Sequence, residues 1–251
     1  MPDTVCDFLE WDTNFFGVRI ARIKDDHLTA AQVSLIEDWA SEEAIDCLYF
    51  FCNADDNESI VSAERMNCHL VDIRLEFEMK LPSSGAITAP TSGIRSFRPE
   101  DVPALMSLAS TSHRGSRFYS DGRFPQETCD KLYARWIERS CMGYANQVLV
   151  AEFNGAPAGY ISCHLHPDGE GSLGLLAVAE QARGQGLGGA LMREGTRYLQ
   201  ENGCVHVNFI AQARNITALR IYEGLGFRMR GTKLCYHKWI SRGTNQAAEQ
   251  N

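Results

Sequence analysis

The sequence of 251 residues predicts an α/β protein, and three observations support this fold class. First, the apolar run 173–178 meets a glycine-rich turn and then an amphipathic segment, 187–199, which is the order strand, turn, helix. Second, two strand-like runs flank Asn154-Gly155, a dipeptide typical of hairpin turns. Third, a strand–helix–strand pattern occurs in the first third of the chain and again in the last third.

The composition is that of a globular protein with one large domain or two modest ones. Hydrophobic residues make up 44% of the chain and charged residues 22%, which argues against a disordered or fibrous protein. The formal net charge of −8 argues against a general nucleic-acid or membrane-surface binder. An anionic ligand would therefore have to be met by arginines concentrated in one pocket.

The cysteines and the N-terminal sequence favour a cytoplasmic protein. There are nine cysteines, an odd number without a C-x-x-C pair, and they are scattered through predicted strands and helices. The opening MPDTVCDFLEWD is acidic and has no apolar run, and no stretch reaches the length of a membrane span. We therefore expect reduced thiols and a cytoplasmic location.

The first 82 residues predict a small α/β domain. An alternating strand ends near Ile23, and Thr29 is placed to cap a helix with apolar residues at helical spacing. A strand, 48–52, and a helical segment beginning near Asn57 come next, before a long alternating strand. The core face of that last strand is expected to carry Val71, Ile73, Leu75, Phe77 and Met79.

The same pattern returns in the last third of the chain when a constant offset is applied. The matched pieces are 48–53 with 206–211, Asn57 with Asn215, and 70–79 with 228–237. Glu64 then takes the place of Tyr222, and no glycine-rich turn precedes the first copy. The N-terminal region is either a degenerate, non-catalytic half of the same fold or a coincidental strand–helix–strand unit.

A segment without charged residues separates this region from the rest of the chain. Between Leu81 and Gly93 the sequence PSSGAITAPTSG has the composition of a linker, and the tail after Ile240 is polar. The predicted divisions are an N-terminal domain, 1–82; a linker, 83–93; a second domain, 94–240; and a disordered tail, 241–251.

The second domain begins with a strand, a turn and a helix start over 93–105, and Pro99 suits a first helical turn. Cations and aromatic residues interleave over 112–125, ahead of a helix. The strands 148–153 and 158–165 form the predicted hairpin, and the strand 173–178 leads into the glycine turn.

The turn 183–189 is expected to bind a phosphate group. Glycines let backbone N–H groups approach a ligand, and the helix after the turn presents unpaired N–H groups and the positive end of its dipole. The turn lacks the Gly-Lys-Ser/Thr of a triphosphate loop, and the next strand, 205–211, lacks the acid of a dinucleotide site. The remaining common ligand of such a turn is the pyrophosphate of coenzyme A.

Two motifs in this sequence resemble the signatures of the GCN5-related N-acetyltransferase (GNAT) superfamily. The first is Gln181-x-x-Gly184-x-Gly186-Leu187-Gly188, and the second runs from Asn215 to Phe227 at the expected distance. The resemblance implies a GNAT acyl-CoA N-acyltransferase fold, which is an α/β fold with a mixed sheet. It also implies acetyl-CoA as co-substrate. No cluster of His, Cys, Asp or Glu has metal-ligand spacing, so no metal ion is expected, and the internal repeat would make the N-terminal domain a partial GNAT-like one.

By this resemblance, backbone groups hold the co-substrate. Main-chain groups of 176–178 would pair with the pantetheine arm, and a backbone N–H near Val178 would face the thioester oxygen. The residues expected to bind acetyl-CoA are Leu176, Ala177, Val178, Arg183, Gly184, Gln185, Gly186, Leu187, Gly188, Gly189 and Asn215.

Asn215 and Tyr222 are separated by about two helical turns, so they share one face of a helix if Asn215 begins it. A tyrosine with an ordinary pKa near 10 is protonated at neutral pH and can donate to a thiolate whose thiol has a pKa near 8.5. Tyr222 is therefore the candidate general acid. The alternative is an ordinary packed tyrosine on an amphipathic helix.

The resemblance places the acceptor site among the elements between the first two helices of the second domain. Arginines and aromatic residues there could grip a diphosphate and stack a base or sugar, although a polar loop with its aromatic residues in the core is the alternative. The candidate acceptor-binding residues are Arg117, Phe118, Tyr119, Asp121 and His164. His164 and His166 are also candidate general bases, and a structural or exposed histidine is the alternative. Direct attack on the thioester fits better than a covalent acetyl-enzyme.

Further motifs along the chain look like the dTDP-fucosamine acetyltransferase type. They are 9–17, the segment from Arg117-Phe118-Tyr119 to 132–137, and 173–177. This likeness implies N-acetylation of a TDP-linked 4-amino-4,6-dideoxyhexose for surface polysaccharide. The alternatives are a GNAT enzyme for another amine (an aminoglycoside, a polyamine or a protein N-terminus) and a non-catalytic acyl-CoA-binding module. The expected partners are a small-molecule substrate and a possible second copy in a homodimer, with neither nucleic acid nor membrane.

Overall fold

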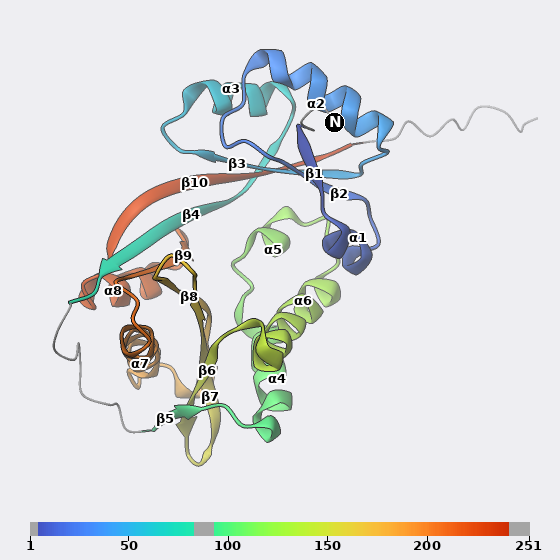
Figure 1. Cartoon of the computed structure of the whole chain (residues 1–251). Helices are drawn as coiled ribbons and strands as arrows, with labels where there is room; N and C mark the ends of the chain where they lie inside the picture. Colours follow the sequence, from blue (N-terminus) through green and yellow to red (C-terminus); the bar gives the residue numbers. More distant parts are fainter. Residues whose placement is uncertain (1–4, 83–92, 241–251) are drawn as a thin grey trace, which may run out of the picture. The chain divides into compact units, whose positions relative to one another are not determined.

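The computed structural model describes residues 5–82 and 93–240 and confirms the α/β class (Figure 1). The chain divides into two compact units. Unit 1 consists of residues 1–72 and 233–251, and unit 2 consists of residues 73–232. Each unit has a β-sheet and its own helices.

The sheet of unit 1 has the strand order β1-β2-β3-β10. Strands β2 and β3 run parallel, whereas β1 pairs antiparallel with β2 and β10 pairs antiparallel with β3. Side chains from α2 and α3, such as Ile36 and Ala63, pack with Leu48 and Phe50 of β3 to form the core. The elements are β1 (Cys6–Phe8), α1 (Glu10–Phe16), β2 (Ile20–Ile23), α2 (Ala30–Glu42), β3 (Cys47–Asn53), α3 (Asn57–Arg65) and the later part of β10 (Arg228–Trp239).

The sheet of unit 2 has the strand order β4-β9-β8-β7-β6-β5. Strands β8 and β9 are parallel and the other neighbours are antiparallel, so the sheet is mixed, as the resemblance implied. The strands are β4 (His69–Lys80), β5 (Ile94–Ser96), β6 (Gln147–Phe153), β7 (Ala156–Leu165), β8 (Glu170–Val178) and β9 (His206–Gln212). The helical elements are η1 (Pro99–Asp101), α4 (Val102–Ser112), α5 (Arg117–Asp121), α6 (Gln126–Arg139), η2 (Ser140–Tyr144), η3 (Glu180–Ala182), α7 (Leu187–Glu201) and α8 (Ile216–Gly224).

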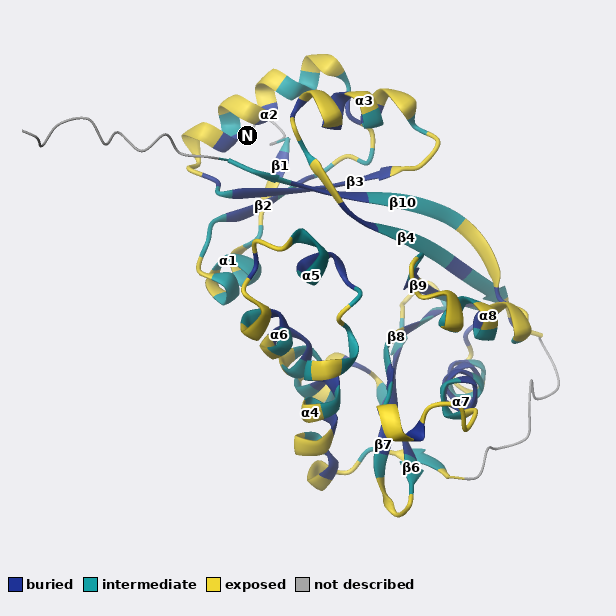
Figure 2. Ribbon diagram, turned by 180° about the vertical axis from the view of Figure 1, so that it is seen from behind, coloured by how far each residue is buried: buried dark blue, intermediate teal, exposed yellow. Residues whose placement is uncertain are grey.

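Helices α7 and α4 lie on opposite sides of strands β6, β7 and β8 (Figures 1 and 2). Successive residues of β7 explain this arrangement, because side chains alternate between the faces of a sheet. Ile161 and Cys163 pack with Leu191 of α7 in the core of unit 2. Tyr160 faces the other way and bonds to His113, the residue after α4.

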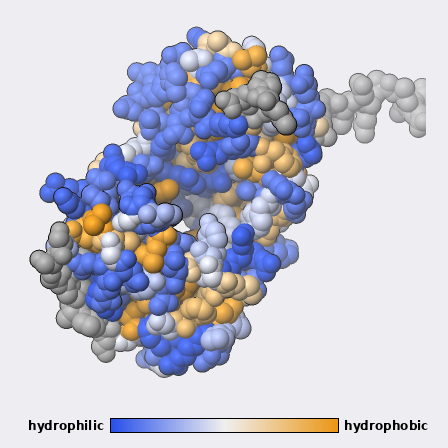
Figure 3. All heavy atoms as spheres, viewed as in Figure 1, coloured by the Kyte–Doolittle hydropathy of each residue, from blue (hydrophilic) through white to orange (hydrophobic). Residues whose placement is uncertain are grey.

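The surface shows no single large apolar area on the face seen in Figure 3, where hydrophobic residues form separate patches among hydrophilic ones. None of the helices within residues 5–82 and 93–240 has both the length and the apolar composition that crossing a membrane requires.

The units differ from the predicted domains, because each contains a strand segment that the prediction assigned to the other. Residues 74–80 of β4 pair with β9 in unit 2, and residues 233–239 of β10 pair with β3 in unit 1. Long-range strand pairing caused this difference, and no local signal in the sequence reports it. The predicted linker, apart from Gly93, and the predicted tail lie outside the described residues.

The internal repeat is visible in the element bounds. The offset that carries Cys47 to His206 also carries the end of β3 to the end of β9, and both ends of β4 to both ends of β10. Left-handed residues match as well: Ala44 (φ 51°) corresponds to Gly203 (φ 85°), and Asn67 (φ 55°) to Gly226 (φ 89°). The two strand–helix–strand units therefore share their local geometry as well as their order of elements.

The structure corrects the predicted register of this repeat by one residue. Asp56, rather than Asn57, matches Asn215, because each is the N-cap of its helix. Ala63, rather than Glu64, matches Tyr222, because each accepts the N–H of the residue five positions later. The first copy thus has a methyl group at the position of Tyr222.

The first copy of the repeat also differs at the position of the glycine turn. Its helix there is α2, and the N–H groups at the start of α2 are bonded to side chains. Thr29 and Gln32 form a capping box at α2, as the predicted cap at Thr29 required. The N–H of Leu28 donates to Ser59 Oγ at 2.7 Å. These N–H groups are already satisfied by the protein, which leaves fewer donors for an anion.

Candidate active site

Strands β8 and β9 part from each other within the sheet of unit 2. Their parallel pairing is limited to Glu170 with His206, Gly171 with Val207, and Ser172 with Asn208. Strand β8 nevertheless continues to Val178, and β9 continues to Gln212. The β9-facing edge of residues 173–178 therefore has no partner strand among the described residues, and an extended ligand can pair there. We call this gap the β8–β9 opening.

The ladder with β7 shows which backbone groups face the opening. Ala179 donates its N–H to the C=O of Ala158 at 2.7 Å, next to the end of β8. Paired positions along an antiparallel ladder alternate between hydrogen-bonded and non-hydrogen-bonded pairs. The backbone groups of Leu176 and Val178 therefore point away from β7 and line the β8–β9 opening.

The glycine turn leaves a row of N–H groups free. Gly184 and Gly186 are left-handed, with φ of 77° and 75°, a conformation that favours glycine. Gly186 is the N-cap of α7, and no side chain caps that helix. The N–H groups of residues 184–189 are bonded to no acceptor within the described parts of the chain. Free donors at the positive end of a long helix fit a pyrophosphate, so these residues fit acetyl-CoA.

Small residues bring this turn close to β8 and α8. A methyl group on Gly188 would contact both Val178 and Ile221, and one on Gly189 would lie 3.4 Å from Arg193 Nη1. Arg183, which is exposed, directs its Nε at the C=O of Val178 at 3.4 Å. The turn, the end of β8 and helix α8 thus form one continuous site, with guanidinium groups beside the free N–H groups.

Asn215 caps helix α8 by accepting the N–H of Ala218 through Oδ1 at 3.2 Å. An asparagine at this position stabilises a helix start in any protein. Its amide nitrogen is left to donate to a ligand. The predicted placement of Asn215 at the start of the helix is confirmed, and its role in binding acetyl-CoA stays a prediction.

Tyr222 lies on α8 with its ring buried, 8% exposed. Its ring packs edge-on against Phe209 at 4.5 Å and against Phe77 at 5.7 Å between centroids. Its hydroxyl has no hydrogen-bond partner among the residues that the structure describes, and it is not sealed from solvent. Burial raises the pKa of Tyr222 to about 12, so the hydroxyl is protonated at neutral pH.

His164 lies beside Ser162 and Gly174, where the ladder between β7 and β8 is irregular. The register shifts between Ile161 and Cys163. The hydroxyl of Ser162 accepts the N–H of Leu175 at 2.9 Å and lies 3.2 Å from His164 Nε2. The alternation of Ser162 and His164 along β7, continued by His166 just after it, is the signal in the sequence that relates them.

Polar side chains continue from His164 across the same face of three strands. The register places His164, Ser172 and Asn208 side by side, and Glu170 beside His206. His166, just after β7, donates its N–H to the C=O of Glu170 at 2.9 Å and so joins the second row. Two of these pairs are hydrogen-bonded: His166 Nε2 with Ser172 Oγ at 2.8 Å, and Asn208 Nδ2, which donates to Glu170 Oε2 at 3.0 Å. We call this group the polar patch. It lies on the face opposite α7.

The predicted acceptor segment around α5 is more buried than a binding loop. Arg117 and Phe118 are 9% and 2% exposed. The ring of Phe118 packs against Phe124 and Trp136, and the guanidinium of Arg117 lies 4.1 Å from the centre of the Phe118 ring. In this structure the Phe118 ring thus packs in the core, as the alternative interpretation of the loop expected, and its role in acceptor binding stays a prediction.

The other two residues of that segment have local partners. Tyr119 donates its hydroxyl proton to Asp130 Oδ1 at 2.7 Å, and Asp121 Oδ1 accepts the N–H of Arg123 at 3.2 Å. The structure thus ties Tyr119 to α6, and the contact of Tyr119 and Asp121 with an acceptor stays a prediction.

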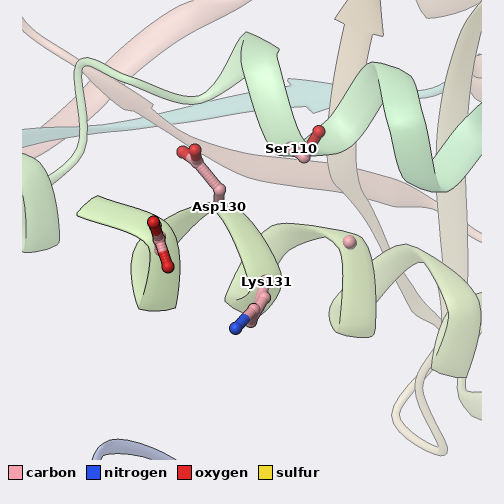
Figure 4. A pocket seen from close by; sticks show the side chains of 5 residues that line it. Ser110, Asp130 and Lys131 are labelled. Carbon is pink, nitrogen blue, oxygen red and sulfur yellow. The ribbon is translucent and has the colours of Figure 1, made fainter. Parts of the chain in front are cut away.

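A shallow pocket of about 270 Å³ lies between α4 and α6 (Figure 4). Its lining residues are Ser110, Glu127, Asp130, Lys131 and Ala134. The side chain of Asp130 rises from α6 toward α4, and that of Lys131 points away (Figure 4). None of the residues around the β8–β9 opening lines this pocket.

His113 is a half-buried histidine that sequence reasoning missed. Its ring stacks on Tyr133 at 4.5 Å, and its Nε2 is hydrogen-bonded to the Tyr160 hydroxyl at 3.0 Å. Although part of the residue stays accessible, burial of the ring lowers the pKa of His113 to about 4.

Within residues 5–82 and 93–240, no group of His, Cys, Asp and Glu side chains is arranged to hold a metal ion.

Comparison with protein families matches residues 105–227 to the acetyltransferase (GNAT) family. The spore coat polysaccharide biosynthesis protein SpsD of Bacillus subtilis is 28% identical over 141 residues, which are 56% of this chain and 48% of that protein. The mycothiol acetyltransferase of Acidothermus cellulolyticus is 40% identical over 88 residues, 34% of this chain and 27% of the relative. The chain thus spans half or less of the length of these relatives.

A solved structure of a GCN5-related N-acetyltransferase from Sphaerobacter thermophilus has a similar fold. The TM-score is 0.66 at 17% sequence identity, and the match covers 95% of this chain and 77% of that one. At this identity the likeness establishes the fold, which is the GNAT acyltransferase fold.

Proposed function

We propose that this chain, whose residues 105–227 match the acetyltransferase (GNAT) family, transfers the acetyl group of acetyl-CoA to the amino group of a nucleotide-linked amino sugar. A TDP-4-amino-4,6-dideoxyhexose is the specific acceptor proposed. The observation that carries the proposal is the row of free N–H groups at residues 184–189, beside the β8–β9 opening and helix α8.

Acetyl-CoA supplies an activated acetyl carbon and a sulfur leaving group. The N–H groups of residues 184–189, with Arg183, would bind its pyrophosphate. The backbone groups of Leu176 and Val178 would pair with the pantetheine arm, with one N–H of residues 176–178 directed at the carbonyl oxygen. The amide nitrogen of Asn215 would donate to the arm from the start of α8.

Tyr222 is the proposed general acid. Its free hydroxyl is on the helix beside the glycine turn, and its raised pKa keeps it protonated. Proton transfer from a donor with a pKa of about 12 to a thiolate in water would be unfavourable, because the thiol that forms has a lower pKa. The same apolar surroundings also raise the pKa of a thiol that forms there, which reduces the mismatch between donor and acceptor.

Two observations support a sugar as the acceptor. The polar patch offers histidine, serine, asparagine and glutamate groups, which suit hydroxyl-rich molecules. The name of the relative SpsD refers to the biosynthesis of a polysaccharide. Both favour a sugar over a peptide or a polyamine.

The second candidate is a GNAT enzyme for a different amine. Its support is the likeness to mycothiol acetyltransferases, whose name refers to mycothiol and not to a nucleotide sugar. A non-catalytic acyl-CoA-binding module fits less well, because Tyr222 keeps a free hydroxyl beside the proposed cofactor site.

The proposal is tested by measuring release of free thiol from acetyl-CoA in the presence of different amines. The panel is TDP-4-amino-4,6-dideoxygalactose, glucosamine and spermidine, with TDP as the amine-free control. We expect the highest kcat/KM with the TDP-linked sugar. A preference for glucosamine or spermidine would favour the second candidate, and binding of acetyl-CoA without transfer to any amine would contradict an enzymatic function.

A further inference from the structure

The polar patch leads to the point where β8 and β9 separate. Its last member along β7 before the irregular register is His164, which pairs with Ser172 of β8, two residues before Gly174. Gly174 is exposed, whereas Ser162 is only 1% exposed. An acceptor on the patch can therefore approach Gly174 and His164, but it cannot reach the hydroxyl of Ser162.

Gly174 is needed because the imidazole of His164 lies over the strand at this position. A methyl group on Gly174 would overlap Ser162 Oγ and would lie 2.8 Å from His164 Nε2. Real side chains do not make such contacts, so any other residue here would displace the imidazole. The absence of a side chain thus keeps Nε2 of His164 close to the β8–β9 opening.

Ser162 is the hydrogen-bond partner of the His164 ring. Nε2 lies 3.2 Å from the Ser162 hydroxyl, a long distance for such a hydrogen bond. In the tautomer that a base requires, Nε2 carries the lone pair. Ser162 is itself held by the N–H of Leu175 at 2.9 Å. Nε2 is therefore oriented and only weakly engaged.

We infer that His164 is the general base for the acceptor, taking a proton from the substrate ammonium group at Nε2 while the rest of the acceptor lies on the polar patch. This inference rests on the proposed function. Ser162 and Gly174 act as positioning residues, because one holds the imidazole and the other leaves room for it.

The proton balance of this step is complete. An N–H bond of the ammonium breaks and an Nε2–H bond of His164 forms, which frees the lone pair of the amine. The amine nitrogen then bonds to the acetyl carbon as the carbon–sulfur bond breaks, and Tyr222 gives its proton to sulfur. The remaining extra proton on nitrogen restores the Tyr222 hydroxyl. One substrate proton thus ends on sulfur by way of Tyr222, and the other passes from His164 to solvent.

The surroundings of His164 keep it neutral. Burial and the nearby His166 lower its pKa, and the bond to Tyr144 opposes them. The other groups around it are the Tyr144 ring, edge-on at 5.7 Å; Arg139, above that ring; and Glu170, which is bonded to Asn208. A neutral imidazole at pH 7 can accept a proton.

The test compares wild type, His164→Ala and His69→Gln in the full chain. His69 is an exposed histidine at the start of β4, outside the site, and serves as the matched control. The acceptor is TDP-4-amino-4,6-dideoxygalactose or, if another amine of the panel reacts faster, that amine. We expect His164→Ala to lower kcat/KM about 100-fold and to lose the acidic limb of the pH profile, while the Kd for acetyl-CoA changes less than twofold. Added imidazole should restore part of the rate in proportion to its free-base concentration.

A rate within threefold of wild type, or a slow variant that imidazole does not rescue, would overturn the role of His164. Unchanged acetyl-CoA binding shows that the variant is folded. Failure of the proposed function would give a different result, because the wild-type protein itself would then acetylate none of the amines. Gly174→Ala gives a second measurement, with kcat falling as the imidazole is displaced and the acetyl-CoA Kd retained.

Discussion

The ring of Phe77, from strand β4, lies edge-on to the ring of Tyr222, from helix α8, with 5.7 Å between the centroids. Phe77 also stacks on Phe209 at 5.2 Å. Strand β4 precedes the predicted linker, yet its residues 74–80 pair with β9 in unit 2. A segment assigned by sequence to a non-catalytic region therefore supports the proposed general acid.

Replacing Phe77 with leucine should impair catalysis more than binding. The smaller side chain removes one wall against the Tyr222 ring, so we expect kcat to fall severalfold with little change in the acetyl-CoA Kd. The free energy of unfolding should drop by about 1–2 kcal/mol. Phe50→Leu in unit 1, where Phe50 stacks on Tyr236, is the matched control. Equal kcat values for the two variants at equal stability would contradict a positioning role for Phe77.

Removing only the hydroxyl of Tyr222 tests the general acid. Tyr222→Phe keeps the ring contacts with Phe77 and Phe209, so stability and acetyl-CoA affinity should stay near those of wild type. Turnover should fall about 100-fold, because no proton reaches the leaving sulfur. Steady-state kinetics and calorimetric titration with acetyl-CoA provide the two readouts, and wild-type turnover would remove Tyr222 from the mechanism.

Replacing the left-handed Gly184 of the turn should weaken acetyl-CoA binding, whereas the same change at a left-handed glycine elsewhere should not. Gly184→Ala forces an alanine to φ of 77°, which costs about 1 kcal/mol and shifts the N–H groups of the turn. We expect the acetyl-CoA Kd to rise at least tenfold. Gly155→Ala imposes similar strain at φ of 77° in the β6–β7 hairpin, and its Kd should match wild type. Similar Kd values for the two variants would argue against cofactor binding at the turn.

Half-buried His113 should make the protein less stable in mild acid. Its folded-state pKa is about 4, below the unfolded value near 6.5, so only the unfolded chain gains a proton between these values. The stability from the neutral imidazole is present above pH 6.5 and is lost as pH falls toward 4, by no more than about 3 kcal/mol. Urea unfolding at pH 7.5 and pH 5 measures this loss. The loss should shrink in His113→Phe, and an equal loss in both proteins would assign it to other groups.

The sequence by itself determined the local parts of the site. Left-handed glycines at 184 and 186, the helix that starts at Leu187, and the Asn215 cap two turns before Tyr222 all depend on residues close in the chain. Such features follow from backbone sterics and helix geometry, so their residue types are sufficient to predict them. The α/β class and the mixed sheet of the GNAT fold were predictable for the same reason, together with the family motifs.

Only the tertiary structure decided which distant segments meet. The pairing of β4 with β9 brings Phe77 to Tyr222, and the irregular register of β7 and β8 brings His164 over Gly174. The repeat register, predicted one residue off, was likewise settled by helix caps and strand ends. Strand pairing and core packing join residues far apart in sequence, and a shift of one residue turns a side chain to the opposite face. Local patterns carry no information on that choice, which is why the buried position of Phe118 and the polar patch emerged only from the fold.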